Sequence, residues 1–162
     1  MERGNHSCLR VLLFLHVDTR LPHHADFLIR DGLKRTGASW GRFDVEIFGA
    51  HRLLPIIAEA MNMRSRVTGI ATGDQAIFAT VPAFGPGYPD IPLMEDIVLS
   101  KRLKRAGKPL YIATPVVTSG RRWEKRGVKR TILLMWLLRF AFFLGVNPYW
   151  LARLYGYTPR KS

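Results

Sequence analysis

Three acidic side chains lie where carboxylates could do chemistry. Asp18 follows an apolar run, and Glu95 and Asp96 open a segment with helical character. A carboxylate at the end of a buried strand can bind Mg²⁺ or Mn²⁺, which prefer oxygen ligands, and paired carboxylates can supply a general base. Each feature also has a simpler interpretation. Asp18 could cap a turn, and Glu95 and Asp96 could act only on the helix dipole.

Two further stretches combine residues suited to binding. Gly73-Asp74-Gln75 could form a binding loop or only the entry to a strand. Arg121-Arg122-Trp123 could clamp a diphosphate, because the guanidinium fork matches phosphate geometry. It could equally be a basic surface cluster anchored by one tryptophan. Taken singly, motifs this short are weak evidence for function.

Strand patterns surround these motifs. Strands are expected at residues 11–15, 40–48, 75–80 and 109–117. The first is a continuous apolar run, which is typical of a fully buried parallel strand. The second alternates apolar residues with Arg42, Asp44 and Glu46, which indicates a half-buried strand.

Helical patterns alternate with the strands. Helices are expected at residues 25–34, 53–67, 94–106 and 129–145, with a shorter one around 150–155. Residues 94–106 give the clearest pattern, because acids lie in the first turn, bases crowd the end and Gly107 follows. Residues 81–92, rich in Pro and Gly, and residues 118–122 are expected to be loops. Strands alternating with helices predict an α/β fold.

The chain is strongly basic. Its 162 residues hold 25 Lys and Arg against 12 Asp and Glu, a net charge of +13. Eleven of the bases and one acid fall in residues 101–130, directly before an apolar segment at 132–146. This combination suits docking on an anionic membrane surface, although a solvated basic face is the commoner reason for such charge. Two features of the apolar segment argue against a membrane span. Arg139 lies at its middle, and the segment is shorter than the roughly 20 residues that a span requires.

Composition excludes several classes of protein. The single cysteine, Cys8, cannot form an intrachain disulfide, so a disulfide-stapled secreted scaffold is excluded and a structural zinc site is disfavoured. The apolar run at 11–15 is too short for a secretory signal. We therefore expect a cytoplasmic protein that could contact the inner face of the membrane.

In their order along the chain, these motifs resemble family 2 glycosyltransferases of the GT-A fold. The matching stretches are Leu-Phe-Leu-His-Val-Asp-Thr-Arg at 13–20, Gly-Asp-Gln at 73–75, Pro-Leu-Met-Glu-Asp at 92–96 and Ser-Gly-Arg-Arg-Trp at 119–123. More narrowly, the chain looks like a bacterial branch known as arsenosugar-biosynthesis-like transferases. The resemblance runs from Val11 to Tyr157. It implies the C-terminal part of a GT-A mixed sheet flanked by helices in residues 1–128, and a helical region in residues 129–162.

The resemblance also implies a reaction. A sugar would pass from a nucleotide-diphosphate donor to an unknown acceptor by metal-assisted inverting displacement. Asp96 would be the general base, with Glu95 as its neighbour and substitute. Asp18 and His16 would lie at the divalent cation, Mn²⁺ or Mg²⁺. The residues implied near the donor diphosphate or the acceptor are Asp74, Gln75, Arg121, Arg122 and Trp123.

The sequence departs from the family pattern in two ways. Its metal motif, His16-Val17-Asp18, offers one carboxylate, and nothing before Val11 resembles the family's nucleotide-binding half. We therefore expect a truncated enzyme with little or no activity alone, and an edge strand that exposes apolar surface. The alternative is a non-catalytic basic module that docks on an anionic membrane or on nucleic acid. Nucleic acid is disfavoured, because the aromatic residues gather in the apolar segment rather than among the bases.

Overall fold

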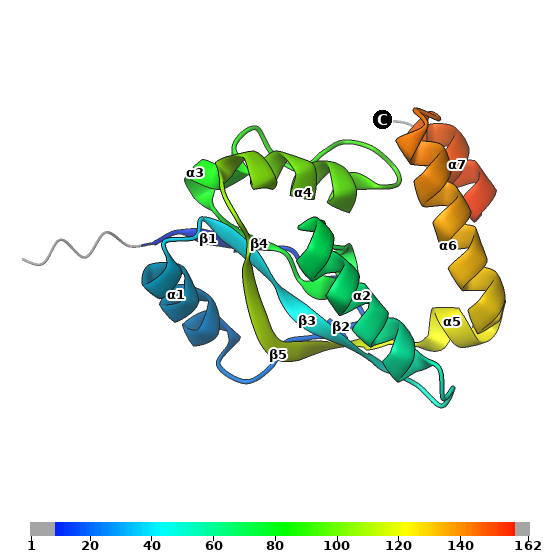
Figure 1. Cartoon of the computed structure of the whole chain (residues 1–162), viewed down its shortest axis with the longest axis horizontal. Coiled ribbons are helices and arrows are strands. Elements are labelled where there is room, and N and C mark those ends of the chain that lie inside the picture. Colours follow the sequence, from blue (N-terminus) through cyan, green and yellow to red (C-terminus); the bar gives the residue numbers. More distant parts are fainter. Residues whose placement is uncertain (1–8, 158–162) are drawn as a thin grey trace, which may run out of the picture.

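The computed structural model describes residues 9–157, so Cys8 lies outside the described residues. These residues form a mixed α/β fold in which helices flank one curved sheet (Figure 1). The strands are β1 (Val11–Leu13), β2 (Thr19–Arg20), β3 (Trp40–Phe48), β4 (Phe78–Thr80) and β5 (Leu110–Ser119). They are ordered β1-β4-β3-β5-β2, with β3 and β5 parallel and the other neighbours antiparallel. The predicted α/β class is confirmed.

The first strand differs from its prediction as a fully buried parallel strand. β1 has three residues, pairs antiparallel with β4 and lies at one edge of the sheet. Leu12 on this strand is 37% exposed. A strand is buried on both faces only where other elements cover it, and an apolar run does not reveal its position in a sheet. The separate expectation of an edge strand that exposes apolar surface agrees with the position of β1 and the exposure of Leu12.

Five of the seven helices within residues 9–157 agree closely with their predicted ranges, and α3 and α5 were not predicted. They are α1 (Ala25–Thr36), α2 (Leu54–Thr68), α3 (Val81–Phe84), α4 (Glu95–Ala106), α5 (Arg121–Arg126), α6 (Val128–Phe143) and α7 (Pro148–Tyr155), with a 3₁₀ turn, η1, at Gly73–Gln75. Both α1 and α2 end at a glycine with positive φ, Gly37 at 67° and Gly69 at 66°. This conformation lets the glycine amide close the last helical turn.

Three segments are organised differently from the prediction. The strand expected at 75–80 begins only at Phe78, because Thr72 and Gln75 form a reciprocal capping box that closes η1. The loop expected at 118–122 is absent, since β5 continues to Ser119 and α5 begins at Arg121. The short α3 takes up the first residues of the loop expected at 81–92.

Within the described residues, α6 and α7 make up the predicted C-terminal helical region. They pack against each other at the right of Figure 1. An apolar cluster of Met94, Leu138 and Leu151 joins them to the start of α4. No helix within residues 9–157 combines the length and apolar character that crossing a membrane requires.

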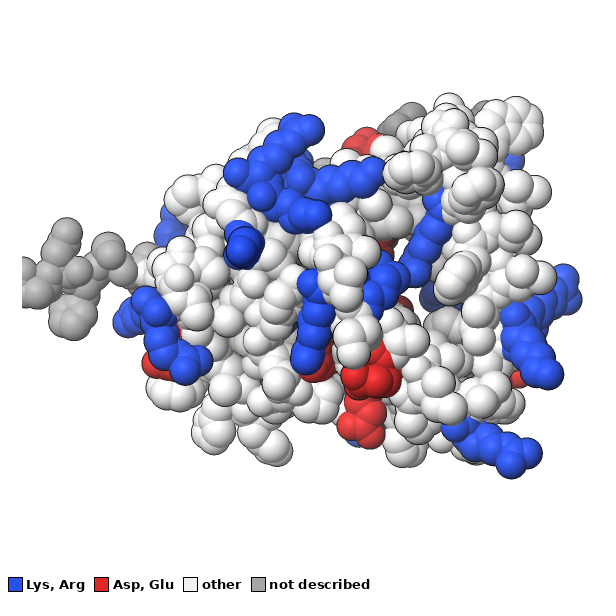
Figure 2. All heavy atoms as spheres, in the orientation of Figure 1, with Lys and Arg blue, Asp and Glu red and all other residues white. Residues whose placement is uncertain are grey.

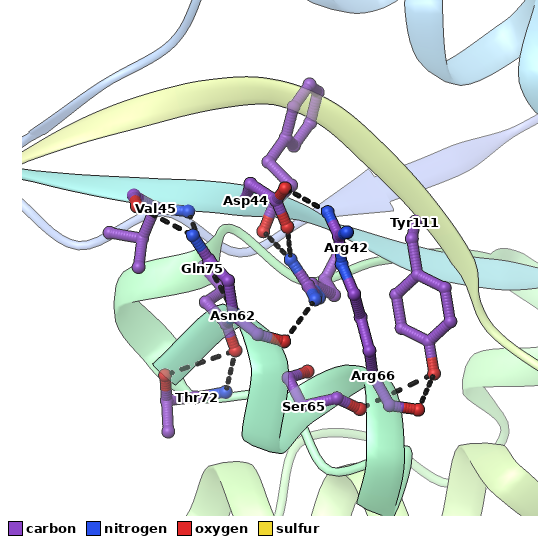
Figure 3. Close-up of polar contacts among 10 residues, drawn as sticks. Arg42, Asp44, Val45, Asn62, Ser65, Arg66, Thr72, Gln75 and Tyr111 are labelled. Atoms are coloured by element: carbon purple, nitrogen blue, oxygen red, sulfur yellow. Dashed lines mark hydrogen bonds and ion pairs between the residues drawn. The ribbon is translucent and has the colours of Figure 1, made fainter. Parts of the chain in front are cut away.

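The most consequential departure from the sequence pattern lies on β3. Its bounds match the prediction, but Arg42 and Asp44 are buried rather than solvated. Arg42 Nη1 donates to Asp44 Oδ1, and its Nη2 donates to the Asn62 carbonyl oxygen of α2 at 3.1 Å (Figure 3). Arg66, also on α2, pairs with the other Asp44 oxygen. Arg42 and Asp44 on β3 therefore face α2. They can be buried there because α2 supplies partners for their charges.

A second set of hydrogen bonds extends this network to η1. The Asn62 side chain accepts from Val45 N at 2.9 Å and donates to Val45 O at 3.1 Å. Gln75 Nε2 donates to Asn62 Oδ1 at 3.2 Å, and Gln75 Oε1 accepts from Thr72 N at 3.1 Å (Figure 3). Gln75 is fully buried. These bonds fix the 73–75 turn to β3 and α2.

We expect Asp44→Ala to lower the free energy of unfolding by about 3–5 kcal/mol, because it leaves the buried Arg42 guanidinium without its carboxylate. Burial already lowers the pKa of Arg42, and Asp44 acts in the opposite direction. The measurement is urea denaturation followed by circular dichroism.

Asp31→Ala is the matched control. Asp31 pairs with Arg35 at 4.0 Å across one turn of α1, and both side chains are more than half exposed. Its loss should cost no more than about 0.5 kcal/mol. Equal losses of unfolding free energy in the two variants would show that the buried pair of Arg42 and Asp44 stabilises the fold no more than an exposed pair does.

Candidate functional site

Asp96 is held at the start of α4 by two backbone groups. Its Oδ1 accepts from Ile97 N at 2.7 Å, and its Oδ2 accepts from Gly73 N at 3.1 Å. The second bond joins α4 to the 73–75 turn, 23 residues earlier in the chain. The carboxylate is thereby fixed in orientation, which a positioned general base requires.

His16 lies on the other side of the same turn. Its Nδ1 is 3.1 Å from Asp74 Oδ1. Its Nε2 approaches Gly73 so closely that a Cβ there would lie 2.3 Å away, so a larger residue at position 73 would displace the His16 ring. Asp18 lies exposed in the turn closed by the bond from Thr19 N to His16 O. The structure thus brings together three predicted stretches: 16–18, 73–75 and 95–96.

Asp18, Asp74, Glu95 and Asp96 form an acidic cluster. Burial and neighbouring charges raise the pKa of two of its members, Glu95 and Asp96. Burial raises the pKa of Asp96, against the opposing effect of its two backbone hydrogen bonds. Burial and then the charge of Asp96 raise the pKa of Glu95. Burial, Glu95 and Asp96 together raise the pKa of Tyr88 to about 12. A carboxylate with a raised pKa binds a proton more readily, which suits a general base.

Two arginines, Arg64 and Arg139, also lie in the electrostatic field of the acidic cluster. Burial, and then the charge of Arg139 on α6, lower the pKa of Arg64 on α2 to about 10, and Asp96 acts in the opposite direction. Arg139 also lowers the pKa of Asp96. Among the described residues, the buried Nε and Nη2 of Arg64 and Nε of Arg139 have no hydrogen-bond partner. Such donors can bind anionic oxygens, and the lone arginine in an apolar segment was the signal for Arg139.

Aromatic rings lie beside the acidic cluster. The ring centroid of Phe14 is 4.9 Å from that of Tyr88 and 5.0 Å from that of Phe84. Tyr88 in turn feels the charges of Glu95 and Asp96. Such a group of rings can pack against the apolar face of a sugar or a base.

The remaining predicted residues are placed differently. Arg121 Nε donates to Ser119 Oγ at 3.2 Å, and Arg122 Nη1 donates to the Tyr155 hydroxyl at 3.1 Å. Trp123 packs against the main core. Within residues 9–157, no hydrogen bond or ion pair joins these three to the acidic cluster. Gln75 points to Asn62 instead, a geometry that favours a supporting role over contact with an acceptor.

The side chains near Asp18 offer few ligands for the implied divalent cation. No group of three or more His, Cys, Asp or Glu side chains in the described part of the chain could hold a metal ion. Both His16 nitrogens lie against the 73–75 turn, which leaves the exposed Asp18 as the more available ligand. A single carboxylate suits Mg²⁺ that brings its own waters and phosphate ligands. The residues therefore fit a cation that arrives with a nucleotide, and not a protein-only metal site.

Comparisons with known proteins identify no relative. No family model, no curated protein and no solved structure matches this chain.

We expect His16 to titrate above its ordinary pKa of 6.5, chiefly because its ring N–H donates a hydrogen bond to the Asp74 carboxylate. Since the folded pKa is raised, this contribution to stability is complete below pH 6.5 and is lost as the pH rises through the folded pKa. Asp74→Asn should lower the pKa of His16, and Asp18→Asn should lower it less. NMR titration of the His16 ring protons measures this pKa in the wild type and in both variants. An unchanged His16 pKa in Asp74→Asn would contradict the pairing.

Proposed function

We propose that this chain supplies the catalytic, acceptor-side half of a family 2 glycosyltransferase with a GT-A type sheet. The observation that carries the proposal is the meeting of His16, Asp74 and Asp96 through the 73–75 turn. These residues come from three separate stretches of sequence, and the resemblance assigns all three stretches to one active site. Their convergence supports that assignment independently of the motif order.

In the proposed reaction, Asp96 accepts the proton of the acceptor hydroxyl. The hydroxyl oxygen then forms a bond to the anomeric carbon, while the bond from that carbon to the donor phosphate breaks. The electron pair of the broken bond leaves with the nucleoside diphosphate, so the configuration inverts. The bonds from Gly73 N and Ile97 N keep Asp96 oriented, and burial raises its pKa toward the range of an effective base.

The charge that develops on the leaving diphosphate needs stabilisation. Arg64 and Arg139 offer buried guanidinium N–H groups without partners among the described residues. Fixed donors in a partly dehydrated site act strongly on developing charge. A cation bound to Asp18 and the diphosphate would add neutralising charge to the leaving group.

Asp96→Asn should reduce sugar transfer by roughly 10²- to 10⁴-fold, the usual contribution of a general base. Nucleotide binding should remain nearly unchanged, because the base acts on the acceptor proton. Glu95→Gln should cost less. The assay measures transfer and donor hydrolysis with Mn²⁺ and a panel of nucleotide sugars by the chain joined to a family 2 nucleotide-binding half, because little or no activity is expected of the chain alone.

Asp26→Asn is the control for this variant. Asp26 is the second residue of α1, as Asp96 is of α4, but it is exposed and, among the described residues, makes no hydrogen bond or ion pair with the acidic cluster. The control should leave turnover unchanged. Saturable turnover that is equal in wild type and Asp96→Asn would exclude Asp96 as the base.

Asp18→Asn should weaken Mn²⁺-dependent binding of a nucleoside diphosphate and leave metal-free binding unchanged. The reason is that Asp18 offers the most exposed carboxylate of the cluster. Calorimetry with and without Mn²⁺ measures the difference, and paramagnetic broadening of amide signals near His16 locates the ion. Unchanged metal dependence would remove Asp18 from the cation site.

A further inference from the structure

The outer face of α6 is apolar and exposed. Leu133, Trp136, Leu137, Phe140 and Leu144 recur at helical spacing, and each is at least 56% exposed. Figure 2 shows a largely uncharged surface over α6 and α7, with basic side chains at its lower end near α5. Contiguous exposed apolar residues of this size are unusual for a surface that faces only water.

Neighbouring residues extend this face and give it an amphipathic character. Trp150 and Leu154 of α7 are 63% and 72% exposed. The Arg153 guanidinium lies 5.4 Å from the Trp150 ring centroid, and Lys101 Nζ lies 6.0 Å from that of Phe143. Exposed Trp rings and long cationic side chains are both common on protein surfaces that meet a membrane interface.

A basic cavity of about 340 Å³ opens between α5, α6 and α7. Its charged lining consists of Lys125, Arg126 and Arg130, and its apolar lining includes Leu134 and Leu154. Because Leu154 also belongs to the exposed apolar face, the cavity and that face are continuous.

The cavity is organised around Tyr155. Arg126 Nη1 donates to the Tyr155 carbonyl oxygen at 3.1 Å, and the Arg126 guanidinium lies 4.8 Å from the Tyr155 ring centroid. Across residues 9–157, no carboxylate forms an ion pair with Lys125, Arg126 or Arg130. The nearby Glu124 instead accepts from Ala50 N at 2.6 Å. Three cationic side chains therefore surround one cavity without neutralisation, which is the chemistry of a phosphate site.

We propose that this cavity binds the phosphate headgroup of an anionic phospholipid while the apolar face of α6 and α7 enters the membrane interface. The charge pattern favours a lipid, because a phospholipid joins an anionic head to apolar chains as the cavity joins bases to Leu154. A second protein copy would bring the same uncompensated positive charge to the contact. This inference concerns α5, α6 and α7 and does not depend on the glycosyltransferase proposal.

The test is flotation of the full chain with phosphatidylcholine vesicles and with vesicles that also contain phosphatidylglycerol. We expect binding to the anionic vesicles alone, weakened by salt, with a blue shift of tryptophan fluorescence as Trp136 and Trp150 enter the interface. Replacing Lys125, Arg126 and Arg130 together by Gln should weaken vesicle binding by roughly 100-fold, on the scale known for basic residues near a charged membrane.

A charge-matched variant separates the cavity from net charge. Replacing Arg30, Lys34 and Arg35 of α1 by Gln removes the same charge from exposed positions on another helix. It should change binding far less than the cavity variant. Equal losses would show general attraction to anionic surfaces and would overturn the cavity site. Circular dichroism confirms that both variants are folded.

A third variant tests the apolar face. Trp136→Ser with Phe140→Ser keeps every charge and should still abolish the fluorescence shift and most binding. Three results would overturn the proposal. They are binding of soluble glycerol phosphate without binding of vesicles, concentration-dependent dimerisation through this face without lipid binding, and binding of single-stranded RNA in place of vesicles.

Discussion

The buried ion pair between Arg42 and Asp44 is the constraint on which the rest of this fold depends. Two charges at the centre of a sheet are costly unless their hydrogen-bonding groups find partners, and α2 supplies those partners. Asn62, in the same helix, also fixes Gln75 and with it the turn that carries Gly73 and Asp74. A buried polar network between β3, α2 and η1 therefore positions the acidic cluster. The cluster does not rely on the flexible side chains of its own surface.

The helices were predictable because their signals are local. Capping glycines and charges at the helix ends act within one turn, so α1, α2, α4 and α6 were found within two residues of their bounds. The strands were less predictable, because the burial of a strand depends on elements distant in sequence. The apolar run at β1 lies at an edge, and the alternating β3 is covered on its polar face by α2. Alternation distinguishes two faces of a strand but does not say which of them meets solvent.

Only some residues of the candidate site could be placed from the sequence. The resemblance assigns His16, Asp74 and Asp96 to one site, and the structure places all three at the 73–75 turn. Arg139 was assigned only a cost in a membrane, because its proximity to Asp96 arises from the packing of α6 against the start of α4. Trp123 was expected near the diphosphate, yet its segment forms a helix that packs against the main core. Such placements come from tertiary packing and leave no local signature.

The position of Arg139 on α6 has a mechanical consequence. The same helix carries Trp136 and Phe140 on its outer face, while Arg139 influences the proton affinity of Asp96 on the inner side. A rotation of α6 about its own axis would change the distance between that guanidinium and the carboxylate. Because the interaction of two charges depends on their separation, Asp96 would hold its proton more or less tightly as the helix turned. The position of α6 and the pKa of Asp96 are linked through this one guanidinium.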